Sequence, residues 1–187
     1  MSASETPRVP LWNIANILTM TRMVMVPIFV VVAALYHEDI AMRWVIAGIF
    51  VLAMVTDFVD GYLARSRNLI TDFGKIADPI ADKALMTTAL VCLNIVDQLS
   101  VWVTVIILIR EFGITIWRMA LLRRGKVVPA SKGGKLKTVL QSFAVGLYLW
   151  PLPSWMDIPT SFIMWMAVVV TVITGVQYLI DGQKQNS

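Results

Sequence analysis

Four aspartates lie within 26 residues of one another in a chain that is otherwise strongly apolar. Asp57 and Asp60 follow one apolar run, and Asp78 and Asp82 precede the next. An ionisable side chain near hydrocarbon is costly unless a partner stabilises it, so these residues are candidates for function. Because helical neighbours lie three, four and seven positions apart, each pair of aspartates occupies one face of its own helix.

The short connection between the two runs predicts antiparallel neighbouring helices, which can bring the four carboxylates together. Four negative charges at one point need neutralisation, and Arg65 and Lys83 supply too little. Oxygen-only ligands suit Mg²⁺ or Mn²⁺, and four carboxylates can hold two such ions about 3.5–4 Å apart for displacement at phosphorus. In the alternative, purely structural interpretation, the aspartates pair with Lys83, Arg65 and Arg110.

The complete pattern reads Asp57-x-x-Asp60-Gly61-x-x-Ala64-Arg65, eight residues, then Gly74-x-x-x-Asp78-x-x-x-Asp82. The small residues in it, Gly61, Ala64 and Gly74, allow close helix packing or leave room for a ligand beside the ions. The pattern resembles the signature of the CDP-alcohol phosphatidyltransferases, and all eight defining positions are present. Eight fixed positions over 26 residues make this a specific motif.

The resemblance implies a six-helix membrane enzyme that moves a phosphatidyl group from CDP-diacylglycerol to an alcohol and releases CMP. It implies two Mg²⁺ or Mn²⁺ ions that assist attack of the acceptor hydroxyl on phosphorus. Asp57 and Asp78 would bridge the ions, Asp60 would complete one, and Asp82 would serve the other and act as general base. The implied CDP-diacylglycerol-binding positions are Asn16, Thr19, Arg22, Gly61, Ala64, Arg65, Thr71 and Gly74. For Arg22, contact with a lipid phosphate is an equally good interpretation.

The composition supports a membrane protein, because 58% of the 187 residues are hydrophobic and only 15% are charged. Soluble domains have about 45–50% apolar and about 25% charged residues. We predict one all-α integral membrane domain over residues 1–187, with a tail and interfacial helix in residues 1–21. Six transmembrane helices are expected. The first follows the interfacial helix and ends near residue 36, and the other five cover about 44–63, 76–96, 100–122, 136–150 and 161–180.

Basic residues predict the orientation of the chain. Six spans put both termini on one side, together with the 64–75 turn and the 123–137 connection. That side has eleven lysines and arginines: Arg8, Arg65, Arg67, Lys75, Arg123, Arg124, Lys126, Lys132, Lys135, Lys137 and Lys184. The opposite loops have Arg43 alone. By the positive-inside rule, both termini and the aspartates face the cytoplasm, across the inner membrane.

A second group of charges lies in and after the fourth expected span. Arg110 and Arg118 are eight residues apart on one helix face, and Glu111 can pair with Arg110 or orient it. A small-residue segment follows, whose lysines precede or begin a helix and favour anion binding. The predicted acceptor-phosphate residues are Arg110, Arg118, Lys132, Lys135 and Lys137. For Arg123, Arg124 and Lys126, a solvated loop touching anionic lipids is as good an interpretation.

Within the family, this stretch is similar to enzymes whose acceptor is sn-glycerol 3-phosphate, which would make the product phosphatidylglycerophosphate. Inositol phosphate, or phosphatidylglycerol in a cardiolipin synthase of the same fold, are alternative acceptors. Outside the family, the chain could be a divalent-cation carrier. The expected partners are the two substrates and membrane lipids, with no nucleic acid, and the family resemblance suggests a homodimer.

Overall fold

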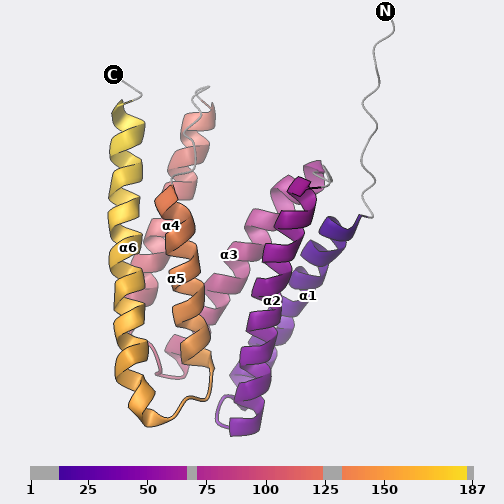
Figure 1. The fold of residues 1–187 in the computed structure, drawn as a ribbon, viewed down its shortest axis with the longest axis vertical. Coiled ribbons are helices and arrows are strands. Elements are labelled where there is room, and N and C mark those ends of the chain that lie inside the picture. Colours follow the sequence, from indigo (N-terminus) through magenta and orange to yellow (C-terminus); the bar gives the residue numbers. More distant parts are fainter. Residues whose placement is uncertain (1–12, 67–70, 124–131, 185–187) are drawn as a thin grey trace, which may run out of the picture. The chain divides into compact units, whose positions relative to one another are not determined.

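The computed structural model describes residues 13–66, 71–123 and 132–184, and all the regular structure in these residues is helical. Six α-helices and one 3-10 helix follow one another along the chain (Figure 1). Their bounds are α1 Ile14–Tyr36, α2 Ile40–Ser66, α3 Asp72–Ile95, α4 Val101–Arg123, α5 Lys132–Leu149, η1 Ser154–Met156 and α6 Asp157–Lys184.

The first helix differs from the prediction, since no separate interfacial helix precedes the first span among the described residues. Asn13 caps the helix, and its side-chain oxygen accepts from the backbone N–H of Asn16 at 2.9 Å. From Ile14 the helix then runs unbroken to Tyr36, through Pro27. The described part of the expected interfacial helix and the first span therefore belong to one continuous helix. Residues 1–12, which include the expected tail over residues 1–10, lie outside the described residues.

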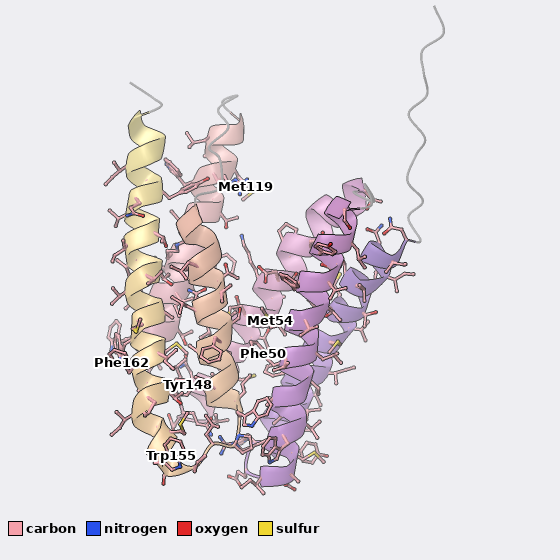
Figure 2. All side chains as sticks on the ribbon, viewed as in Figure 1. Phe50, Met54, Met119, Tyr148, Trp155 and Phe162 are labelled. Atoms are coloured by element: carbon pink, nitrogen blue, oxygen red, sulfur yellow. The ribbon has the colours of Figure 1, made fainter. Side chains whose placement is uncertain are left out.

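The chain divides into two compact units, and the boundary falls inside α3, after Thr88. In the first unit, α1 packs along α2 (Figure 1). Phe29 and Phe50 meet with ring centroids 6.2 Å apart, and Phe50 is labelled on α2 in Figure 2. Small buried residues, among them Ala33, Ala47 and Ala53, let the two backbones approach closely, which is how helices pack when lipid surrounds them.

In the second unit, α6 packs against both α4 and α5. Its inner face buries Met164, Ala167 and Thr171, and Thr171 accepts a 2.8 Å hydrogen bond from the amide of Gln141 on α5. Tyr148 of α5, labelled in Figure 2, lies 3.1 Å from the Ser161 hydroxyl of α6. This packing brings α4, α5 and α6 together around buried polar residues.

Three stretches of the described residues are long and apolar enough to cross a membrane: Asn16–Tyr36, Ile40–Leu63 and Ser154–Ile180. Helix α5 contains a shorter apolar stretch, Leu136–Leu149. Large apolar side chains are widely exposed, for example Phe58 and Trp102. An apolar exterior of this kind suits contact with lipid. The prediction of an all-α membrane protein is therefore confirmed.

Candidate active site

One face of α1 is polar and buried, although most of the helix is apolar. Asn16, Thr19 and Arg22 follow one another at steps of three residues, so they line the same side of the helix. Their exposed fractions are 2%, 1% and 0%. Each makes hydrogen bonds to α2 or to the beginning of α3. This face of α1 therefore holds the surrounding polar groups in the first unit.

Arg22 lies between two of the predicted metal ligands. Its two terminal nitrogens donate to Asp57 Oδ1 and Asp60 Oδ2, and both contacts are ion pairs. The two carboxylates are three residues apart on α2, as the sequence spacing predicts, so one planar guanidinium can reach both. A buried cation next to a carboxylate pair lowers the cost of keeping those charges at the edge of an apolar helix.

Thr19 connects these carboxylates to α3. Its hydroxyl donates to Asp78 Oδ1 at 2.6 Å and lies 3.4 Å from Asp60 Oδ2. Asp57, Asp60 and Asp78 therefore gather around the side chains of Thr19 and Arg22, and we call these five residues the acid cluster. Asp82 lies one turn beyond Asp78 on α3 and is half-buried.

The beginning of α3 is fixed by a separate set of bonds. Thr71 donates to Asn16 Oδ1 at 2.8 Å and accepts from the backbone N–H of Gly74 at 3.0 Å. A Cβ atom at Gly74 would lie 3.1 Å from Asn16 Oδ1, 3.2 Å from Thr71 Oγ1 and 3.6 Å from Asp78 Oδ2. A larger side chain at this position would therefore require Asn16 and Thr71, which hold the beginning of α3, to shift by a few tenths of an ångström.

The chemistry of the acid cluster suits a hard divalent cation, since it offers carboxylate oxygens beside a hydroxyl and already stabilises one positive charge. As they stand, the described acidic, histidine and cysteine side chains form no group of three that closes on one ion position. The described carboxylates instead converge on Arg22 and Thr19. Gly61 is partly buried on α2, and the side chains of Ala64 and Arg65 lie outside the described set.

The second unit contains a cluster of opposite charge. Lys137, 5% exposed, forms an ion pair with Glu111 Oε1, and Arg110 approaches the same oxygen at 3.3 Å. Arg110 also donates to the Thr174 hydroxyl of α6 at 3.4 Å. We call Arg110, Glu111, Lys137 and Thr174 the cation cluster. It brings α4, α5 and α6 together at one place in the unit.

The structure joins only part of the predicted acceptor-phosphate set. Arg118 is exposed two turns further along α4, so it is not placed in the cation cluster with Arg110. The eight-residue spacing puts both arginines on one side of α4. In the part of the chain that the structure describes, the hydrogen bond given between this side and α6 is the one from Arg110 to Thr174. The side chains of Lys132 and Lys135 lie outside the described set.

Sequence reasoning missed several of these contacts. It had considered Glu111 with Arg110 but not with Lys137, which is 26 residues away. It also missed Thr174 and Gly175 of α6, where a Cβ at Gly175 would lie 3.1 Å from Arg110 Cγ. A weak signal existed, because Thr171, Thr174 and Gly175 interrupt one side of an otherwise apolar helix.

Comparison with known proteins places this geometry in context. The family model described as CDP-alcohol phosphatidyltransferase matches residues 12–173. A Mycobacterium tuberculosis protein named "Probable phosphatidylglycerophosphate synthase" is 48% identical over 170 residues, covering 89% of this chain and 80% of the relative. The Bacillus subtilis protein named CDP-diacylglycerol--glycerol-3-phosphate 3-phosphatidyltransferase is 37% identical over 181 residues, covering 90% and 94%. A Rickettsia felis protein with the same name is 38% identical over 170 residues, covering 89% and 93%.

Proposed function

The chain belongs to the CDP-alcohol phosphatidyltransferase family, and we propose that it transfers the phosphatidyl group of CDP-diacylglycerol to sn-glycerol 3-phosphate. The products are phosphatidylglycerophosphate and CMP. The observation that carries this assignment is the likeness over about nine-tenths of the chain to relatives named for this reaction. The complete aspartate motif and the cation cluster support it from the chemistry of the residues.

We propose that Asp57, Asp60, Asp78 and Asp82 hold two divalent ions, Mg²⁺ or Mn²⁺. When bound, such ions supply charge that stabilises the pyrophosphate and the developing negative charge at the reacting phosphorus. The acid cluster supports this role because three of the four carboxylates come together around two shared donors. The family resemblance adds Asp82 as the base that takes the proton of the attacking hydroxyl. The acceptor oxygen then bonds to phosphorus as the bond to CMP breaks.

The nucleotide end of CDP-diacylglycerol is proposed to bind beside the acid cluster, at the start of α3 and the end of α2. The residues of this proposed site are Asn16, Thr19, Arg22, Gly61, Ala64, Arg65, Thr71 and Gly74. The compact bonding of Asn16, Thr71 and Gly74 supports a pre-formed wall for the site. Thr19 and Arg22 are almost completely buried and hold the carboxylates, so they would support this site through Asp57, Asp60 and Asp78.

For the acceptor, we propose that Arg110 and Lys137 bind the phosphate of sn-glycerol 3-phosphate, with Arg118, Lys132 and Lys135 as further candidates. Two cations gathered at one place support this, because guanidinium and ammonium groups are strong hydrogen-bond donors to phosphate. An acceptor without a phosphate, such as choline, would have no use for such cations.

We further propose six membrane spans, with α3, α4 and α5 completing the three apolar ones, and a position in the inner membrane. The eleven basic residues on one side support cytoplasmic termini and a cytoplasmic active site. The proposed partners are the two substrates, membrane lipids and a second copy of the chain.

The test is a panel of acceptors given to the purified full chain with labelled CDP-diacylglycerol and Mg²⁺. The expected result is CMP release with sn-glycerol 3-phosphate and a lipid product with the mass of phosphatidylglycerophosphate. Faster release with inositol phosphate or phosphatidylglycerol would reassign the acceptor. No release with any acceptor, together with Mg²⁺ uptake into liposomes containing the protein, would favour the cation carrier.

A further inference from the structure

Helix α1 provides polar side chains that touch the proposed metal ligands without belonging to the aspartate motif. Thr19 and Arg22 are almost completely buried in a helix that is otherwise suited to lipid. A buried arginine in such a helix is costly unless an opposite charge pairs with it, and such residues usually mark functional sites. What these two side chains contact therefore indicates what they are for.

The contacts of Thr19 link carboxylates from two different helices. Its hydroxyl donates to Asp78 of α3 at 2.6 Å and lies 3.4 Å from Asp60 of α2. A single hydroxyl between two carboxylates sets how far apart they lie and how each is turned. Because threonine is β-branched and stiff at χ1, this hydroxyl is itself held in place by the helix.

Arg22 restrains the two carboxylates of α2 in the same way. Its guanidinium donates to Asp57 Oδ1 through one terminal nitrogen and to Asp60 Oδ2 through the other. The fork of a guanidinium is planar and rigid, so it fixes the angle between its two partners, which a lysine ammonium cannot do. Together, Thr19 and Arg22 of α1 therefore orient three proposed metal ligands, which are Asp57, Asp60 and Asp78.

We propose that Thr19 and Arg22 are positioning residues of the divalent-cation site and determine its affinity for metal. The proposal rests on the metal site of the proposed function. Partners in the outer shell of a metal site orient the ligating groups, and their loss typically weakens metal affinity about 10–100-fold. In this protein that outer shell comes from α1, whereas the ligands themselves come from α2 and α3.

The test measures Mn²⁺ binding to the purified full chain in detergent, with free Mn²⁺ read from its electron paramagnetic resonance signal. Thr19→Val keeps the shape and removes the hydroxyl, and Arg22→Lys keeps the charge and removes the fork. Each is expected to raise the dissociation constant for Mn²⁺ about tenfold or more. Thr19→Ser, which keeps the hydroxyl, should restore most of the affinity. Because none of these changes alters the net charge, a weaker affinity reports geometry.

The matched control is Thr21→Val on the same helix. Thr21 is exposed, and its hydroxyl bonds to the backbone oxygen of Ile17 at 2.9 Å, away from the carboxylates. This variant should bind Mn²⁺ as the unaltered chain does. Thermal unfolding of every variant in EDTA shows whether the fold survives without metal. If Thr19→Val does not fold, the Arg22→Lys result decides.

Two outcomes separate this inference from the proposed function. Unchanged Mn²⁺ affinity in Thr19→Val and Arg22→Lys, with affinity lost in Asp78→Asn, would overturn the positioning role and leave the metal site standing. A raised KM for CDP-diacylglycerol in those two variants would then mark them as nucleotide contacts only. Failure of the unaltered chain to bind Mn²⁺ would instead remove the metal site and this inference with it.

Discussion

In the acid cluster of the first unit, one guanidinium pairs with two carboxylates and a hydroxyl holds a third, whereas the cation cluster of the second unit places one carboxylate between two cations. Each therefore contains an internal counter-ion that lowers the cost of burying like charges. Among the residues named, the acid cluster has three carboxylates and one guanidinium, and the cation cluster has two cations and one carboxylate.

The more numerous charge of each cluster supports the role that we propose for it. A divalent cation suits a site rich in carboxylates, and a phosphate suits a site that holds two cations. The comparison is therefore the basis for proposing the reaction centre in α1–α3 and the acceptor phosphate in α4–α6.

The largest expected effect comes from removing a charge of the acid cluster. Asp57→Asn and Asp78→Asn should each lower CMP release at least about 1,000-fold, because the amide binds a divalent cation poorly and leaves the developing charge at phosphorus unstabilised. Asp39→Asn is the matched control, since Asp39 lies before α2 and its carboxylate accepts from the backbone N–H groups of Ala41 and Met42 in the first turn of that helix. Normal turnover in a folded Asp57→Asn protein would contradict the metal assignment.

Removal of metal should have an effect of similar size. Thorough chelation should abolish phosphatidyl transfer, and added Mg²⁺ or Mn²⁺ should restore it. Measuring CMP release before chelation, after it and after re-addition separates metal loss from irreversible unfolding. Activity that persists unimpaired without divalent ions would mean that the acid cluster is a structural ion-pair network.

An intermediate effect is expected in the cation cluster. Arg110→Ala should raise the KM for sn-glycerol 3-phosphate about 10–100-fold, the range for losing a charged hydrogen bond, with little change for CDP-diacylglycerol. Arg118→Ala is the companion variant. Because Arg118 is exposed, this change should raise the KM for sn-glycerol 3-phosphate less than Arg110→Ala does. Equal changes in KM for both substrates in Arg110→Ala would remove the distinction between the clusters.

The smallest effect is expected at Gly175. Alanine there would place a Cβ 3.1 Å from Arg110 Cγ and 3.4 Å from its Nε, so the arginine must shift by a few tenths of an ångström. The KM for sn-glycerol 3-phosphate should rise about two- to fivefold, within the range that small misplacements produce. Gly113→Ala in α4 is the control, because a Cβ there meets nothing within 4 Å. Identical kinetics in both variants would show that Arg110 tolerates the displacement.

The sequence predicted those features of the site that depend on residues close to one another along the chain. Asp57 and Asp60 lie three residues apart on one helix, and one guanidinium reaches both. The motif predicted that Gly74 allows close packing or leaves room for a ligand, and the nearby side chains of Asn16 and Thr71 show that the packing there is close. The family resemblance is confirmed by the matching family model and by the relatives.

The sequence did not predict which side chains contact one another between helices. The sequence interpretation assigned Thr19 and Arg22 to the nucleotide, but in the structure they hold carboxylates 35 to 59 residues away. The pairing of Lys137 with Glu111 and of Arg110 with Thr174 spans 26 and 64 residues. The described part of the expected interfacial helix is likewise part of α1, because that helix runs without a break from Ile14 to Tyr36.

The sequence by itself determined the helices, the aspartate pattern and the family, because apolar runs and spacings of three and four residues act within one helix. Only the tertiary structure decided which charge neutralises which. That choice depends on how far neighbouring helices approach and how they are rotated about their axes, and packing of small residues such as Ala47 and Gly175 sets both.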